Sequence, residues 1–422
     1  MITRRSMLRS AASLALASSA GVRFGSLHAA APDAPRFLLV FLRGGYDCLN
    51  VLVPHSSSYY YEARPNIAIA RPPAGRDIAT LAEGGSLAQR LTQADGEAAI
   101  SLDADWALAP ALIPTVAPLY AQKQLAFVPF AGTPDLTRSH FETQDDIELG
   151  QAQTQNGAGN PPRDLRSGFL ARLASTLSGS RPIAFTDALP ACMRGAEGVP
   201  NISLKSVGKP AFDARQAEML AGLYAGHPLQ QTVREGLELQ AQVNSAVQQE
   251  MQAASRGAIT AKGFELEAQR IARLMRSDYG IGFIDVGGWD THVNENPLLA
   301  TNLDSLGRGL QGLARELGEQ WRNTVVVVLS EFGRTFRENG NRGTDHGHGS
   351  VHWVAGGRIA GGRIVGEQQR LDAGSLFQDR DLPVLTDYRD LLGGIFRRAY
   401  GLSPAQLEQV FPGAAARDLA LL

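Results

Sequence analysis

The sequence is poor in cysteine and lysine, and its charge is nearly balanced. Two cysteines, Cys48 and Cys192, and 4 lysines occur among 422 residues, and 40 basic residues face 42 acidic ones, for a formal net charge of −2. The two thiols allow at most one internal disulfide and exclude a four-cysteine metal site. Balanced charge without a basic block argues against a nucleic-acid partner. Any metal chemistry must therefore use histidines and carboxylates.

Long apolar runs are also missing beyond the amino-terminal segment, so we expect no membrane span in the mature chain. Residues 1–30 read as a twin-arginine signal peptide, because Arg4 and Arg5 precede a weakly apolar stretch and no acidic residue comes before Asp33. The alternative is a chance arginine pair on an amphipathic helix. The signal predicts a periplasmic or secreted mature chain, 31–422.

Short apolar runs alternate with helical patterns along this mature chain. Four runs are typical of buried strands: 37–42, 125–130, 281–285 and 324–330. The segment 301–321 carries leucines at three- and four-residue spacing, as expected for a helix packed on a sheet. The alternation predicts a single α/β domain, a three-layer sandwich whose mixed, mostly parallel sheet has helices on both faces. The segment of about 211–277 is almost wholly helical by pattern, and we expect a helical insertion there.

Histidines and carboxylates concentrate late in the chain. In the motif GGWDTH, an extended backbone would place Asp290 and His292 on the same side. In TDHGHG, Asp345, His346 and His348 stand between glycines that let the backbone bend around an ion. Two such groups at strand ends could hold a pair of divalent metal ions, with zinc or manganese favoured over calcium or magnesium. The plain alternatives are a hydrogen-bonded turn for the first motif and a polar surface loop for the second.

Two further carboxylates follow expected strands. Asp47 comes after the first strand, and Glu331 ends the strand 324–330. Ligands of open α/β sheets bind at the carboxyl edge, so both are candidate metal ligands. Pairing with a nearby arginine, Arg43 for Asp47 and Arg334 for Glu331, is the competing interpretation.

The segment RSHFE offers a nucleophile. Ser139 would open a helix, whose amino terminus favours developing negative charge, and a metal contact could ionise its hydroxyl. The same spacing, Ser139 to Glu142, is also that of a capping box, which needs no catalysis. His140 could donate a proton to a leaving group. Arg138, together with Arg43 and Arg334, could hold an anionic substrate.

Five motifs in one order, GGYDCLN, RSHFE, GGWDTH, SEFGRT and TDHGHG, resemble the twin-arginine-exported domain-of-unknown-function family fifteen-oh-one of the alkaline-phosphatase/sulfatase superfamily. The resemblance extends from Phe37 to about Pro412. It implies an alkaline-phosphatase-like fold and a two-metal site with a nucleophile between the metals. By order along the chain it makes Ser139 the nucleophile and the following residues metal ligands: Asp47, Asp290, His292, Asp345, His346 and His348.

This sequence departs from the superfamily pattern in two places. Glu331-Phe332 stands where an Asp-His pair is usual, and Asp290 and His292 are separated by one residue instead of three. Neither cysteine nor Ser139 is followed by the x-Pro-x-Arg of formylglycine sulfatases, which disfavours a sulfatase of that type.

Two functions follow from these patterns. The first is an exported metal-dependent hydrolase of phosphate or sulfate esters, acting on a small anionic ester or glycan through Ser139. The second, motivated by the replaced Asp-His pair, is a non-catalytic exported binding or surface protein that keeps the fold. The sequence leaves the substrate, the metal and the oligomeric state open.

Overall fold

The computed structural model describes residues 34–79, 98–151, 164–177, 179–204, 214–238 and 263–422. The predicted signal segment 1–30 lies outside these residues. Among the helices within them, none combines the length and the apolar character needed to cross a bilayer.

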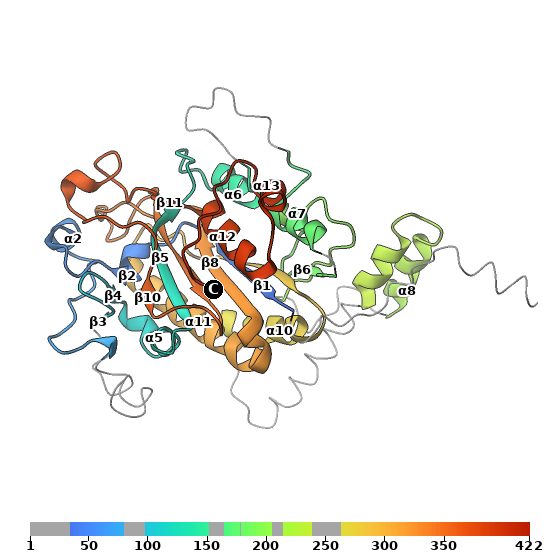
Figure 1. The fold of residues 1–422 in the computed structure, drawn as a ribbon, viewed down its shortest axis with the longest axis horizontal. Coiled ribbons are helices and arrows are strands. Elements are labelled where there is room, and N and C mark those ends of the chain that lie inside the picture. The colour runs from blue at the N-terminus through green and yellow to red at the C-terminus, as the bar shows by residue number, and fades with distance from the viewer. Residues whose placement is uncertain (1–33, 80–97, 152–163, 178, 205–213, 239–262) are drawn as a thin grey trace, which may run out of the picture.

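An eight-stranded sheet forms the centre of the molecule, in the order β10-β5-β9-β8-β1-β7-β6, with β11 beside β5 (Figure 1). Its strands have these bounds: β1 Arg36–Leu42, β5 Leu125–Gly132, β6 Pro182–Ala184, β7 Ile281–Val286, β8 Thr324–Ser330, β9 Ser350–Ala355, β10 Arg363–Ile364 and β11 Thr386–Asp387. A smaller antiparallel sheet has the order β2-β4-β3, from β2 Leu52–Val53, β3 Ile100–Ser101 and β4 Ala107–Leu108. The four predicted strands are confirmed as β1, β5, β7 and β8.

Only β9 runs against its neighbours in the central sheet. It pairs antiparallel with both β5 and β8, whereas β1 pairs parallel with β7 and β8. The sequence analysis did not predict β9, because His352 interrupts its apolar run. His352 is nevertheless fully buried, and burial lowers its pKa to about 3.

Helices cover both faces of the sheet. Those among the described residues are α2 Ser58–Ala63, α5 Val116–Ala121, α6 His140–Leu149, α7 Phe169–Thr176, α8 Ala214–Leu223, α10 Phe264–Ser277, α11 Glu295–Leu317, α12 Tyr388–Tyr400 and α13 Pro404–Val410. Alternate residues of β1 enter two separate cores: Leu38 and Val40 pack with α5, α10 and α11, and Phe37 and Leu39 with α7, α12 and α13. The predicted three-layer α/β sandwich with a mixed, mostly parallel sheet is therefore confirmed.

The predicted helix 301–321 differs from the observed one at both ends. α11 already begins at Glu295, before the leucine ladder starts, and ends at Leu317. The chain then tightens into a 3₁₀ helix over Gly318–Asn323. The leucine spacing marked the buried face and not the helix ends, which depend on caps.

The segment predicted as a helical insertion is only partly described, since 205–213 and 239–262 lie outside the described residues. α10 packs against α11 in the main core, with Ala268, Ile271 and Ala272 fully buried. α8 lies apart from the central sheet in Figure 1. The insertion at about 211–277 stays a prediction.

A glycine after β1 allows a close approach between two loops and gives a first prediction. Gly44 has φ +130°, and a Cβ there would lie 2.4 Å from the backbone nitrogen of Asp290. Gly75, with φ +77°, has no atom within 4 Å of the same position. We expect Gly44→Ala to lower the free energy of unfolding by about 3 kcal/mol, from backbone strain plus overlap, and Gly75→Ala by about 1 kcal/mol, from strain alone. Denaturant unfolding measures both, and equal losses would contradict the close packing of these loops.

Candidate functional site

The central sheet gathers five loops at one edge. The carboxyl ends of β1, β5, β7 and β8 lie at this edge, and β9 begins there because it is antiparallel. The predicted site residues lie on these loops: Arg43 and Asp47 after β1, Arg138, Ser139 and His140 after β5, Asp290 and His292 after β7, Glu331 and Arg334 after β8, and Asp345, His346 and His348 before β9.

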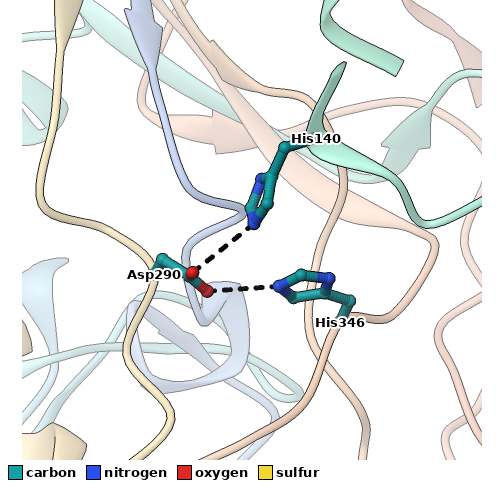
Figure 2. A group of neighbouring side chains, drawn as sticks. All are labelled: His140, Asp290 and His346. Atoms are coloured by element: carbon teal, nitrogen blue, oxygen red, sulfur yellow. Dashed lines mark hydrogen bonds and ion pairs between the residues drawn. The ribbon is translucent and has the colours of Figure 1, made fainter. Parts of the chain in front are cut away.

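Three of these side chains meet at one point. His140, Asp290 and His346 present ligand atoms that all lie within 4.8 Å of one another. The Nε2 atom of His140 lies 3.5 Å from Oδ2 of Asp290, and Nε2 of His346 lies 3.2 Å from Oδ1. Figure 2 shows both rings turning a nitrogen toward the carboxylate, one ring toward each of its two oxygens. We call these three residues the His-Asp cluster.

Both histidines of the cluster are held through their other nitrogen. Nδ1 of His140 lies 2.8 Å from Oε1 of Glu331, and Nδ1 of His346 lies 3.1 Å from the carbonyl oxygen of Arg138. When the ring proton is on Nδ1, each ring donates it to this acceptor and keeps the lone pair of Nε2 for the cluster. Such an outer acceptor is characteristic of histidines that bind metal ions.

Glu331 is itself fixed on several sides. The side-chain amide of Gln144 and the backbone N–H of Gly44 each donate to its Oε1 at 2.8 Å. Burial raises the pKa of Glu331, but the hydrogen bonds from His140 and Gln144 outweigh it and hold the pKa below its ordinary value. Glu331 is therefore an ionised carboxylate under His140, and the pKa of His140 is raised mainly by their hydrogen bond.

Arg334 ties the loops together beneath Asp290. Its fully buried guanidinium donates to Oδ1 of Asp290 at 2.6 Å and to the carbonyl oxygens of Trp289 and Thr344 at 3.2 Å. It also donates to the carbonyl oxygen of Gly44. Burial pushes the pKa of Asp290 upward, yet the hydrogen bond and the charge of Arg334 prevail and lower it to about 2. The buried guanidinium thus supports the cluster from within.

His292 lies beside the cluster. Its Nε2 is 2.8 Å from Oδ1 of Asp290, and its Nδ1 is 3.4 Å from Oδ1 of Asp345. Its ring centroid lies 5.0 Å from that of His346. Like His140, His292 therefore has a carboxylate at each ring nitrogen. The ring of Phe332, which is buried, packs 5.0 Å from the ring of His140 and 4.9 Å from that of His346.

The donor set of the cluster fits a divalent cation. Tetrahedral ligands at about 2.0–2.1 Å from zinc stand about 3.3 Å apart, close to the two separations from Asp290. The Nε2 atom of His140 is buried and accepts no hydrogen bond within the described part of the chain. Two imidazoles and one carboxylate leave further coordination positions open, as in catalytic metal sites. Within the described residues this is the one group of at least three histidine, cysteine, aspartate or glutamate side chains whose ligand atoms all lie within 4.8 Å of one another.

Asp47 lies elsewhere, in a buried ion pair. Its two carboxylate oxygens accept from Arg64 at 2.5 and 3.0 Å, and both side chains are fully buried. Glu295 adds a second buried carboxylate, whose Oε2 accepts from the hydroxyl of Thr344 at 2.7 Å. Arg64 and Asp47 satisfy each other, so the structure does not bring Asp47 to the cluster.

His348 and the predicted substrate arginines also lie outside the cluster. The ring of His348 packs 4.9 Å from that of Phe377, and burial lowers its pKa to about 4. Arg43 forms an ion pair with Glu148 at 2.6 Å, and Arg138 forms one with Asp381 at 2.7 Å.

Ser139 precedes α6, as its N-cap, but does not cap it. Its side chain makes no capping hydrogen bond, unlike Ser403, which completes a capping box at α13. Within the described residues its hydroxyl makes no hydrogen bond, and the side chain is half-buried. Ser139 thus carries a free hydroxyl and directly precedes a cluster histidine, His140, in the chain.

Sequence reasoning missed three supporting residues. Two of them, Gln144 and Glu148, follow His140 at four-residue spacing, so they share one face of α6 with it. This helical spacing could have predicted that both side chains lie near His140. Arg64 gave no such signal, because its pairing with Asp47 depends on how the chain folds back after β1.

Comparisons with known proteins agree with the resemblance in the sequence. A family model described as "Protein of unknown function (DUF1501)" matches residues 34–411. A search of curated proteins found no match. One solved structure, of Ps i-CgsB in complex with k-i-k-neocarrahexaose, is similar at a TM-score of 0.40 and 10% identity, covering 90% of this chain and 75% of that chain.

Two further solved structures are similar at the same level. A protein in the alkaline phosphatase superfamily from Vibrio parahaemolyticus has a TM-score of 0.38 and 12% identity, covering 100% of this chain and 79% of that chain. A 2-O GAG sulfatase has a TM-score of 0.37 and 11% identity, covering 88% and 72%. These likenesses are too distant to transfer an activity, so function must be argued from this chain's own side chains.

The buried carboxylate pair gives a second prediction. Burial and the neighbouring Asp47 carboxylate raise the pKa of Glu295, so the folded state keeps a proton that the unfolded state releases above about pH 4.3. This proton stabilises the fold at low pH, and the stabilisation is lost as pH rises. Glu295→Gln carries no titrating group, so its free energy of unfolding relative to wild type should increase between about pH 5 and pH 8. Urea unfolding at both pH values checks this; the exposed Glu319→Gln is the control, and a pH-independent difference would refute the assignment.

Proposed function

The chain belongs to the DUF1501 family, a family of unknown function, and we propose that it is a metal-dependent hydrolase of phosphate or sulfate esters. The single observation that carries the proposal is the convergence of His140, Asp290 and His346, with Nδ1 of both rings held by acceptors. This arrangement leaves two imidazole lone pairs and one carboxylate directed at a common point.

In this proposal His140, Asp290 and His346 hold a divalent ion, with zinc or manganese preferred for two imidazoles and one carboxylate. His292, 2.8 Å from Asp290, is a further ligand or a support of that carboxylate. Such an ion would polarise an ester oxygen and lower the pKa of a nearby hydroxyl. His140, predicted from the sequence as a proton donor, acts here as a ligand.

Ser139 is the proposed nucleophile. Its hydroxyl stands at the amino terminus of α6, where the helix dipole favours negative charge. On losing its proton to water, its oxygen forms a bond to phosphorus or sulfur as the ester oxygen leaves and takes a proton from water. A second water then attacks the serine ester, which releases phosphate or sulfate and restores the hydroxyl.

Export places this activity in the periplasm or outside the cell, if residues 1–30 act as a twin-arginine signal.

The structure gathers one group of candidate ligands in its described residues, not the pair that the superfamily resemblance implies, because Asp47 binds Arg64 and His348 packs on Phe377. That observation favours the second candidate function, a non-catalytic exported binding protein that retains the fold.

Metal content tests the cluster. We expect purified wild-type protein to hold about one divalent ion per chain after dialysis, and Asp290→Ala and His346→Ala to hold less than about a tenth of that, because each loses one of three ligands. His348→Asn is the matched control from the same loop and should keep its ion. Elemental analysis measures the stoichiometry, and thermal unfolding verifies that each variant is folded. Full metal in both cluster variants would rule out these ligands.

Ser139→Ala tests the nucleophile against the capping interpretation. We expect it to lower the turnover of a phosphate or sulfate ester by at least about a thousandfold, with little change in unfolding free energy, because its side chain makes no capping bond. Ser403→Ala, which removes a genuine capping box, should instead lose about 1 kcal/mol of stability and keep its turnover.

The assay uses para-nitrophenyl phosphate, bis-para-nitrophenyl phosphate and para-nitrophenyl sulfate with zinc, manganese, magnesium and calcium in turn. Turnover that survives Ser139→Ala would remove Ser139 from the mechanism. No turnover by a metal-loaded wild-type protein would leave the non-catalytic binding protein as the function.

A further inference from the structure

A cavity with a mixed polar and apolar lining lies between three segments of the chain. Its volume is about 470 Å³, within the range of about 300–1,000 Å³ that is typical of small-molecule sites. The segments are the connection from β2 to α2, the turn between β3 and β4, and the loop after β10. In Figure 1, α2, β3 and β4 lie on the left of the molecule. The cavity shares no lining residue with the His-Asp cluster, so it is a separate site.

Hydrogen bonds hold the three segments together around the cavity. The hydroxyl of Ser57 donates to the carbonyl oxygen of Leu371 at 2.7 Å, which joins the first segment to the third. The indole N–H of Trp106 donates to Oε1 of Gln368 at 2.8 Å, which joins the second segment to the third. Ser57, Trp106 and Leu371 are buried. The walls are thus fixed by the fold, and a ligand would spend little free energy on ordering them.

Two neighbouring glutamines in this lining are fixed in opposite senses. Gln368 uses its Oε1 as the acceptor for Trp106, so its amide N–H groups keep their hydrogen-bonding capacity. Gln369 uses its amide nitrogen as a donor to the carbonyl oxygen of Ser375 at 2.6 Å, so its Oε1 keeps its capacity. One side chain therefore offers donors and the next offers an acceptor. Hydroxyl groups match both, because each hydroxyl donates one hydrogen bond and accepts others.

A carboxylate and a guanidinium complete the polar lining. Asp105 and Arg370 are both exposed, and neither forms an ion pair with any part of the chain that the structure describes. Their opposite charges cancel in sum, so the lining favours neither an anion nor a cation. Hydrogen bonds from hydroxyls to such charged groups are stronger than those between neutral groups. Pro54, Trp106 and Leu371 add buried apolar residues to the same lining.

We propose that this cavity binds a neutral hexose. A hexose ring combines a rim of hydroxyl groups with an apolar face, as the lining requires. The hydroxyls bind the four polar side chains, and the apolar face of the ring lies against Pro54 and Trp106. The inference goes beyond the proposed function, since no step of the hydrolysis uses this cavity.

Titration with D-glucose, D-galactose and D-mannose in turn, followed by nuclear magnetic resonance, tests the proposal. We expect wild-type protein to bind at least one of them with a Kd on the order of 1 mM. Asp105→Ala and Arg370→Ala should each weaken that binding about tenfold, because each loses a hydrogen bond to a charged group. Arg358→Ala is the matched control, since Arg358 is exposed and does not line the cavity, and its affinity should equal that of wild type. Thermal unfolding verifies that the variants are folded.

The outcomes separate this proposal from the hydrolase. Absence of binding by all three hexoses, or unchanged affinity in both cavity variants, would overturn it. Displacement of the bound hexose by inorganic phosphate would identify an anion site and overturn it as well. Protein dialysed against EDTA should bind the hexose as tightly as protein loaded with zinc, and loss of binding on metal removal would place the sugar at the His-Asp cluster instead. None of these measurements depends on turnover, so either proposal can fail while the other stands.

Discussion

The site depends on one buried positive charge, that of Arg334. The guanidinium of Arg334 is fully buried and donates to backbone carbonyls on the loops after β1, after β7 and before β9, while Arg334 itself follows β8. A buried guanidinium left without partners would cost several kcal/mol, so the loops must close around it in one arrangement. The same group holds Asp290 at 2.6 Å and keeps it ionised. A single side chain thereby fixes where the loops lie and the charge state of the central carboxylate.

The remaining geometry follows from strand direction and ring orientation. Because β9 alone runs antiparallel, His346 arrives at the same sheet edge as residues that follow the parallel strands. Glu331 and the carbonyl oxygen of Arg138 hold the Nδ1 side of the two histidine rings, so both Nε2 atoms face Asp290. Arg138 has a left-handed backbone, φ 54°, and its side chain is anchored on Asp381. Strain of this kind at a loop beside the cluster is typical of functional sites.

Much of the fold could be predicted from the sequence, and the site only in part. Continuous apolar runs locate β1, β5, β7 and β8, and parallel strands that end in polar loops indicate which edge carries the site. Spacing cannot tell which carboxylates reach that edge: Asp47 and Asp290 look alike in sequence, but Arg64 takes one and Arg334 holds the other. His348, two residues from His346, packs on Phe377. The position of each carboxylate depends on the buried arginine with which it pairs, and such pairing is a long-range property.

The central claim is that His140, Asp290 and His346 hold a cation together. Anomalous diffraction from crystals grown with zinc, collected on both sides of the zinc absorption edge, tests it most directly. The account predicts one strong anomalous peak among Nε2 of His140, Nε2 of His346 and the carboxylate of Asp290. A peak at Asp47 or at His348 with none in the cluster, or no peak at any of these residues, would contradict it.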